Sequence, residues 1–437
     1  MRNRSRPRPL ALLAAGGVAL AGTAGFGAAP ALADPPAHVP PPADHVVLIA
    51  LDGFDVDYLD DAPMPNLSAL AQRGSLTAST GVMTSITNPS WSSIATGAWP
   101  STHRNTAYWF DQTTGTARGQ QRDLAVPTIA EAIREQGGTV MASQWFIVQN
   151  HGVAFGDPDG LYTQPGGNCA RRTDDAVAVL NGRPVLSGGQ LVAANGIPDL
   201  VAVYCDTLDA LGHADGAEAP GMPAALADVD AQIGRLVQAA KDAGIFGRTA
   251  FVVTGDHGMG TFTQGMRDEL LGAIAAAGYR AEMLTAGQAP AADTDVVIVV
   301  GGVGSLHLVG DAAGDEHALA AIEAVVTELP HVAAVYDRAE QAAMHVSPNY
   351  GELVIEPEAG WSLGAAPADP AGVHGTTREL EVPLVLSGAG VRPNVAPAAP
   401  RHIDLAPTIA ALLGYAGPDG ADGRVLEEAI RASAVTR

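Results

Sequence analysis

Unbroken apolar runs along the chain predict the buried strands of a sheet. Residues 45–51 form one such run, and residues 199–205, 249–253 and 383–387 form three more that are mostly apolar. A strand that is covered on both faces is apolar nearly throughout, because neither face meets water. We therefore expect these runs, with the shorter residues 139–142, to be strands of a sheet that has helices on both faces.

Segments between these runs have the apolar spacing of helices. Apolar residues three and four positions apart recur in residues 65–74, 126–136, 224–243 and 403–413. Because strands alternate with helices, we expect an α/β fold with a doubly wound, mostly parallel sheet. Ligands of such folds bind beyond the carboxyl ends of the strands, so functional residues are expected there.

Thr87 stands beside a predicted helix start. Asn88 followed by Pro89 is typical of an N-cap residue and the first helical position. The N–H groups and the dipole at a helix N-terminus favour an anion. The hydroxyl of Thr87 is therefore expected to lie where an anionic group would bind.

Two stretches depart from this alternation. Residues 150–196 are rich in Gly, Asn, Asp and Arg and are expected to be largely irregular. Residues 264–362 mix helix-like and strand-like segments, and we expect them to form a smaller α+β subdomain inserted between core segments 45–263 and 363–437. The glycine run at residues 301–304 favours a hairpin turn over a phosphate-binding loop.

The first 33 residues are predicted to be a signal peptide. Four arginines within the first eight residues precede an apolar run over residues 10–29, and residues 31–33 are suited to cleavage. A membrane anchor is the alternative, but the glycines and alanines of the run and the Pro-rich leader at residues 34–44 favour cleavage. No later segment is apolar over the length that a bilayer requires. We expect an exported protein without a membrane span.

The chain is acidic, which limits its partners. It has 47 Asp and Glu residues against 24 Lys and Arg residues, and a formal charge of −23. Binding to nucleic acid needs cationic side chains, so this is not expected to be the main purpose. Lys241 is the only lysine and falls in a predicted helix. Arg171 and Arg172 could contact an anionic substrate, although solvated loop residues are the more common case.

Cys169 and Cys205 are the only cysteines. In an exported protein they could pair, but Cys205 is also explained as a small buried residue at the end of a strand. The spacing of a zinc-thiolate site is absent. Any metal is therefore expected to be held by oxygen and nitrogen ligands.

Potential metal ligands follow the predicted strands. Three carboxylates and three imidazoles suffice for two zinc-type sites with three protein ligands each and an open position. Each residue alone could belong to a polar turn, but their joint placement after buried strands favours a metal centre. The six residues are Asp52, Asp209, His213, Asp256, His257 and His374.

Over about residues 45–415 the sequence resembles the type I phosphodiesterase/nucleotide pyrophosphatase family of the alkaline phosphatase superfamily, with the least specific match in residues 264–362. The resemblance implies an alkaline phosphatase-like core. It rests on motifs in the order seen in that family, namely Asp52-Gly53, Thr87-x-Pro89, Thr96-Gly97-x-x-Pro100, Asp209-x-x-Gly212-His213, Thr254-Gly-Asp256-His257-Gly-Met and His374-Gly375.

The resemblance implies two bound Zn²⁺ ions, or similar divalent metals, and a secreted hydrolase of small anionic phosphate esters. Threonine is a weak nucleophile, and a metal ion lowers the pKa of a bound hydroxyl group. The implied route is a covalent phospho-threonine intermediate that water hydrolyses. The first site would comprise Asp209, His213 and His374, and the second Asp52, Asp256 and His257, with the Thr87 hydroxyl as both metal ligand and nucleophile.

One position departs from the family pattern. The family usually has a phosphate-binding Asn five residues after the histidine that corresponds to His103, and here that position is Tyr108. Asn105 is the nearest amide, and we expect it to bind substrate.

Three other functions are alternatives to that of a phosphodiesterase. A phosphate monoesterase or phosphonate hydrolase would use the same scaffold, but such relatives commonly place a lysine near the site. A sulfatase is disfavoured because the sequence has no Cys-x-Pro-x-Arg segment. A non-catalytic extracellular binding protein that retains its metals is disfavoured because the nucleophile is present.

Overall fold

The computed structural model describes residues 41–431. The signal peptide expected at residues 1–33 lies outside this range, as does the Pro-rich leader up to residue 40, so both stay predictions. Within the described residues, every helix is too short or too polar to cross a membrane.

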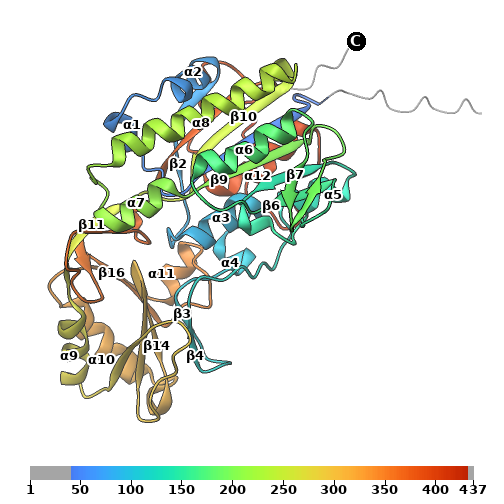
Figure 1. Cartoon of the computed structure of the whole chain (residues 1–437). Coiled ribbons are helices and arrows are strands. Elements are labelled where there is room, and N and C mark those ends of the chain that lie inside the picture. The colour runs from blue at the N-terminus through green and yellow to red at the C-terminus, as the bar shows by residue number, and fades with distance from the viewer. Residues whose placement is uncertain (1–40, 432–437) are drawn as a thin grey trace, which may run out of the picture. The chain divides into compact units, whose positions relative to one another are not determined.

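A seven-stranded sheet forms the centre of the fold, in the order β2-β19-β10-β1-β9-β5-β6 (Figure 1). The five strands from β10 to β6 run parallel, whereas β19 is antiparallel to both of its neighbours. The expected mostly parallel α/β sheet is therefore confirmed. The strands are β1 (His45–Leu51), β2 (Ser75–Thr80), β5 (Val140–Ser143), β6 (Gly160–Thr163), β9 (Leu200–Cys205), β10 (Thr249–Gly255) and β19 (Glu381–Gly388).

Each face of this sheet has its own hydrophobic core. On β1, Val46 and Leu48 pack into one cluster, and Val47 and Ile49 pack into the other. Since successive side chains of a strand point to opposite faces, a strand inside two cores must be apolar throughout. The first cluster contains residues of α3 (Thr87–Thr96), α5 (Ile129–Glu135) and α12 (Leu405–Leu413), and the second contains residues of α2 (Pro65–Arg73), α6 (Cys169–Leu180) and α8 (Met222–Asp242).

Residues 150–196 are more regular than expected. They contain β6, α6 and a hairpin of β7 (Val185–Ser187) and β8 (Gln190–Val192). Asn168 caps α6, because its side chain accepts the N–H of Arg171 at 3.2 Å. Ala176 and Val179 of α6 are buried in the second core, and this burial stabilises the helix. The polar composition of the segment does not indicate it.

A second sheet lies within residues 264–362, in the order β12-β13-β14-β16-β15. Helices α9 (Arg267–Ala276) and α10 (Glu316–Thr327) share one hydrophobic cluster with it, and β3 (Trp109–Asp111) and β4 (Thr116–Arg118) belong to another (Figure 1). Gly302 is at the turn of the β13–β14 hairpin. The strands are β12 (Ala281–Leu284), β13 (Val296–Gly301), β14 (Val303–Leu308), β15 (Val332–Tyr336) and β16 (Leu353–Pro357).

Shorter elements connect the two sheets. A three-stranded sheet in the order β17-β11-β18 follows β10 in the chain and leads to the segment of His374. The remaining elements are α1 (Tyr58–Asp61), α4 (Pro100–His103), α7 (Thr207–Asp215), α11 (Arg338–Ala343), β11 (Gly260–Gly265), β17 (Gly360–Ser362) and β18 (Ala371–Val373), with short 3-10 turns between them.

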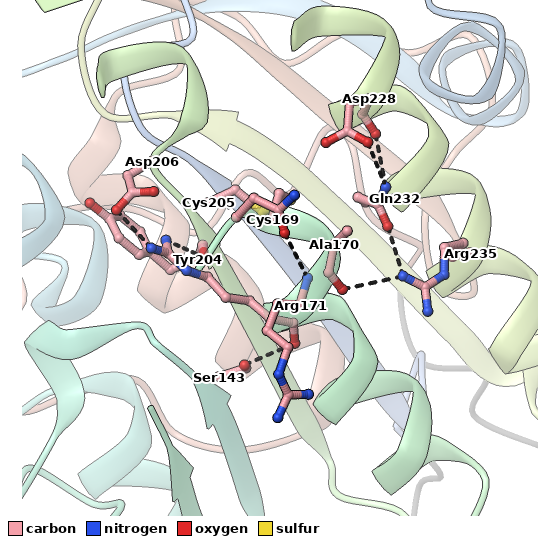
Figure 2. Close-up of a disulfide and its surroundings, with 12 residues drawn as sticks. Ser143, Cys169, Ala170, Arg171, Tyr204, Cys205, Asp206, Asp228, Gln232 and Arg235 are labelled. Atoms are coloured by element: carbon pink, nitrogen blue, oxygen red, sulfur yellow. Dashed lines mark hydrogen bonds and ion pairs between the residues drawn. A yellow bond between two sulfur atoms is a disulfide. The ribbon is translucent and has the colours of Figure 1, made fainter. Parts of the chain in front are cut away.

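Cys169 and Cys205 form a disulfide, which is the pairing that the sequence left open (Figure 2). The bond joins the first residue of α6 to the last residue of β9. Arg172, which is only 4% exposed, binds Asp206 across the same junction with Nη2 and Oδ2 2.8 Å apart. The expectation that Arg172 is a solvated loop residue is therefore wrong, because it is a buried helical residue. Arg171 is exposed on the same helix.

Replacing both cysteines by alanine is expected to lower the free energy of unfolding by about 3–4 kcal/mol. The crosslink spans 36 residues, and its loss restores the conformational freedom of that loop to the unfolded chain. Urea unfolding of the double variant against the parent measures the difference. A change below about 1 kcal/mol would contradict the expectation that this crosslink stabilises the folded protein.

Candidate metal centre

Six potential metal ligands converge beyond the carboxyl ends of two neighbouring central strands, β1 and β10. The other two elements that contribute are α7 and the segment after β18. Asp52 follows β1, Asp256 and His257 follow β10, Asp209 and His213 lie on α7, and His374 follows β18.

Gly53 allows the end of β1 to approach α7. Its φ is +69°, and a Cβ atom at this position would lie 2.9 Å from Cα of Asp209. Its N–H donates to Oδ1 of Asp256 at 3.1 Å. A side chain would strain the backbone and collide with α7, so only glycine suits this position.

The first group of ligand atoms surrounds His257, whose ring is fully buried. Its Nε2 lies 3.2 Å from Oδ1 of Asp52 and 3.4 Å from Oδ2 of Asp256. The hydroxyl Oγ1 of Thr87 lies 3.2 Å from the same nitrogen. Asp52, Asp256 and His257 provide ligand atoms that lie within 4.8 Å of one another, which suits one metal ion.

The second group contains His374 and Asp209. Nε2 of His374 lies 3.6 Å from Oδ1 of Asp209 and 3.1 Å from Nε2 of His213, which is itself 3.3 Å from Oδ1 of Asp209. His257 also lies within 4.8 Å of Asp209 and His374. The structure thus brings all six residues together, with His213 half-exposed at the rim. The division of the six between two metal ions stays a prediction.

Backbone carbonyl groups orient the three histidines. In each ring Nδ1 faces a carbonyl oxygen, which favours the tautomer with the proton on Nδ1. Nε2 then has a free lone pair that points into the centre, as in many metal-binding histidines. The carbonyl partners are Gly258 for His257 (2.8 Å), Ser85 for His374 (2.8 Å) and Gly372 for His213 (3.1 Å).

Each carboxylate has one buried oxygen that has no hydrogen-bond partner within residues 41–431. These atoms are Oδ1 of Asp52, Oδ1 of Asp209 and Oδ2 of Asp256. The second oxygen of Asp256 accepts the N–H of Gly53, and that of Asp52 accepts a hydrogen bond from the Tyr204 hydroxyl. A buried, unsatisfied oxygen costs about 1–3 kcal/mol, and more when it is charged, so a bound cation would stabilise this arrangement.

The crowded carboxylates alter the proton affinities of the centre. Burial raises the pKa of Asp209 to about 7, and the charge of Asp52 adds to this effect. Burial likewise raises the pKa of Asp256 well above its usual value. Burial alone would lower the pKa of His257, but the charges of Asp256 and Asp52 outweigh it and raise that pKa to about 10. Bound protons thus offset the negative charge of the carboxylates, and divalent cations could offset the same charge instead.

The residues present have the chemistry of a site for divalent metal ions. Oxygen and imidazole nitrogen are the ligands that such ions take in proteins when thiolates are absent. The orphaned carboxylate oxygens and the inward-facing Nε2 atoms are the observations that support this fit.

Helix α3 begins at Thr87, two residues earlier than expected. Ile86 is in the N-cap position, and the side chain of Asn88 donates to the carbonyl oxygen of Gln121. The expectation that Asn88 caps the helix is therefore wrong, because a longer-range hydrogen bond uses its side chain. Thr87 nevertheless lies at a helix N-terminus, as the sequence predicts.

Asn105 is not among the residues that line the pocket beside the centre. Its side chain is fully buried, and its Nδ2 donates to Oγ of Ser92 at 2.7 Å and to the carbonyl oxygen of Asn88 at 3.3 Å. A role in substrate binding would require these bonds to change, and it stays a prediction. The pocket measures about 190 Å³, and among its lining residues are Tyr108, Gln120, His213 and His374.

Tyr204 and Gln120 are site residues that the sequence did not reveal. Tyr204 lies in the middle of an apolar strand, where an aromatic residue is expected for packing alone. Gln120 lies in a polar loop with no spacing that points to a ligand. Their contacts with Asp52 and Asn88 join segments far apart in the chain, so a local pattern could not have found them.

The fold and the ligand cluster together define an alkaline phosphatase-like protein. Residues 46–377 match the family model of type I phosphodiesterase/nucleotide pyrophosphatase, and the chain belongs to this family.

Two curated relatives are similar over about half of the chain. An uncharacterized pyrophosphatase/phosphodiesterase of Schizosaccharomyces pombe is 28% identical over 228 residues, which are 49% of this chain and 44% of the relative. A bis(5'-adenosyl)-triphosphatase of Xenopus laevis is 26% identical over 237 residues, which are 49% of this chain and 47% of the relative. The chain thus spans about half the length of the curated relatives it matches.

A solved structure shares the fold over a longer range. Murine ectonucleotide pyrophosphatase/phosphodiesterase 5, in an inactive threonine-to-alanine form in complex with AMP, aligns with a TM-score of 0.66 at 18% identity. The alignment covers 86% of this chain and 96% of the murine chain. At this identity the likeness establishes the fold.

Replacing Tyr204 by Phe is expected to weaken zinc binding about 10- to 100-fold. The hydroxyl holds one oxygen of Asp52 and thereby orients the other toward the centre, and loss of such a supporting hydrogen bond typically has an effect of this size. Competition with a chromophoric chelator measures the affinity without any substrate.

Tyr162→Phe is the matched control. Tyr162 is also fully buried, but its hydroxyl has no hydrogen-bond partner in the described part of the chain, so its removal should leave zinc affinity unchanged. Equal affinities of the two variants would show that Tyr204 does not orient Asp52.

Proposed function

We propose that this protein is an exported, metal-dependent hydrolase that cleaves phosphodiester or nucleotide pyrophosphate bonds through Thr87. The observation that carries the proposal is the position of the Thr87 hydroxyl, at a helix N-terminus and 3.2 Å from a histidine of the metal centre. Family membership supports the same class of reaction.

Bound divalent metals would lower the pKa of the threonine hydroxyl and offset the charge of the phosphoryl group. In the proposed reaction Oγ1 of Thr87 attacks phosphorus, the ester or pyrophosphate oxygen leaves, and water later cleaves the phospho-threonine bond. The chain itself contributes positioning. Helix α3 fixes Thr87 at its N-terminus, where the helix dipole favours an anionic phosphoryl group.

The cationic side chains suit a substrate with a single negative charge at phosphorus. Lys241, the only lysine, lies on α8 with its ammonium 5.3 Å from the ring centre of Phe246. Arg172 is committed to Asp206 and to the carbonyl oxygen of Tyr204. Two divalent cations against three carboxylates would leave a formal charge of about +1, which favours a diester over a monoester.

The ligands and names of similar proteins agree with this substrate class. The murine protein is in complex with AMP, and the Xenopus relative is called a bis(5'-adenosyl)-triphosphatase. We propose small anionic phosphate esters of this kind as substrates. Export is proposed from the predicted signal peptide.

Thr87→Ala is expected to lower turnover of a diester about 10³-fold or more, because the covalent route is lost. Thr87→Ser should keep measurable activity, since it retains a hydroxyl group. Rates with bis(p-nitrophenyl) phosphate on zinc-loaded protein measure both variants. Thr77→Ala, a threonine change on the edge strand β2, is the control and should match the parent. Near-normal turnover by Thr87→Ala would overturn the assignment of the nucleophile.

The diester bis(p-nitrophenyl) phosphate is expected to be preferred over p-nitrophenyl phosphate by about 10²–10³ in kcat/KM. The monoester carries a second negative charge at pH 8, which the site does not compensate. Each 1.36 kcal/mol that this charge adds to the activation free energy lowers the rate tenfold. Both substrates are compared on the same zinc-loaded protein. A preference for the monoester would favour a phosphatase, and turnover of neither would favour a binding protein.

A further inference from the structure

The N–H group next to the proposed nucleophile already has a partner. The backbone N–H of Asn88 donates to Oε1 of Gln120 at 3.2 Å. Asn88 directly follows Thr87, so this N–H is on the first turn of α3, beside the reacting hydroxyl. A side-chain carbonyl oxygen therefore lies where an acceptor oxygen of a substrate would be expected.

Few other N–H groups of this helix terminus could bind a phosphoryl oxygen. Pro89 has none, and the N–H of Ser90 donates to the carbonyl oxygen of Ile86 at 3.0 Å. The N–H groups of Thr87 and Asn88 remain, and a substrate oxygen that binds to the Asn88 N–H competes with Gln120. Because of this competition, the strength of the Gln120 amide oxygen as an acceptor affects which substrates can bind.

Gln120 is placed so that its side chain can leave without unfolding its loop. The residue is exposed, and it lines the pocket that also contains Tyr108 and His374. Its backbone is held by its neighbours, because the carbonyl oxygens of Gly119 and Gln121 accept hydrogen bonds from Tyr108 N–H and from the Asn88 side chain. Rotation of the side chain alone would free the Asn88 N–H.

We propose that Gln120 is a specificity-determining residue whose side-chain carbonyl stands in for a phosphoryl oxygen in the free protein and yields to it on binding. This inference rests on the proposed function. The exchange conserves the hydrogen bond, because Asn88 N–H has an acceptor before and after. A charged phosphoryl oxygen accepts a hydrogen bond about twice as strong as an amide oxygen does, and it displaces Gln120.

The same exchange rejects neutral esters. The carbonyl oxygen of a carboxylic ester carries no net charge and accepts a bond no stronger than that of Gln120. Such a ligand gains nothing by displacing the amide and must also order itself in the site. Gln120 therefore selects anionic ligands.

The decisive variant is Gln120→Glu, which keeps the shape and adds a charged acceptor. Its carboxylate would compete with phosphate for the Asn88 N–H and repel it, so the affinity for inorganic phosphate should fall about 10- to 100-fold. Calorimetric titration of the zinc-loaded protein with inorganic phosphate measures this without turnover. KM for bis(p-nitrophenyl) phosphate should rise in parallel.

Gln121→Glu is the matched control, with the same charge change one residue away. The Gln121 side chain points to Nη2 of Arg118, 3.3 Å from its Oε1, and not to Asn88. Its phosphate affinity should stay within about threefold of the parent. Gln120→Ala, which leaves the N–H open, should bind phosphate as tightly as the parent or more tightly.

Two results would overturn the inference while the proposed function stands. One is equal phosphate affinity of Gln120→Glu and Gln121→Glu in a protein whose parent hydrolyses the diester. The other is a tenfold loss of phosphate affinity in Gln120→Ala, since Gln120 would then bind the phosphate itself. A zinc-loaded parent that neither binds phosphate nor hydrolyses the diester would refute both the function and the inference.

Discussion

Three carboxylates are held in one buried cluster, and much of the site depends on what balances their charge. Asp52 and Asp256 each follow a strand and Asp209 lies on a helix, and each has an oxygen without a hydrogen-bond partner among the described residues. Burial raises the pKa of Asp209 and Asp256, and the charge of Asp52 adds to this effect. Burial alone would lower the pKa of His257, but the charges of Asp256 and Asp52 raise it. The surrounding backbone fixes the cluster despite this repulsion. Gly53 allows α7 to approach the end of β1, and three backbone carbonyl groups orient the histidine rings so that Nε2 points to the cluster.

The sequence predicts five of the seven strands of the central sheet, and it predicts that the candidate ligands follow strands, because both follow from local patterns. A strand between two cores must be apolar along its whole length, and β1 is confirmed at His45–Leu51 as expected. Residues that follow such strands must lie at one edge of a parallel sheet. Asp52 and the pair at residues 256–257 could therefore be placed together before the fold was known. Their role as metal ligands stays a prediction.

Features that depend on contacts between distant segments were predicted less well. Helix α6 is stabilised by burial against α8, and its polar, glycine-rich surroundings gave a wrong expectation of irregular structure. Asn88 has the residue type of a helix cap, yet its side chain binds the loop at Gln121 instead. The disulfide between Cys169 and Cys205 and the hydroxyl of Tyr204 against Asp52 are of the same kind. No spacing in the sequence encodes them.

The turn of the β13–β14 hairpin has a consequence for how the site assembles. Gly302 lies against the backbone of His374, where a Cβ would be 1.9 Å from the carbonyl oxygen, and Gly301 lies against the ring of Tyr108. The pocket wall thus requires segments made early, midway and late in synthesis to meet. Contacts of such long sequence separation form slowly. A metal ion that binds only the completed cluster would bind late in folding. It would stabilise the folded protein relative to partly folded intermediates.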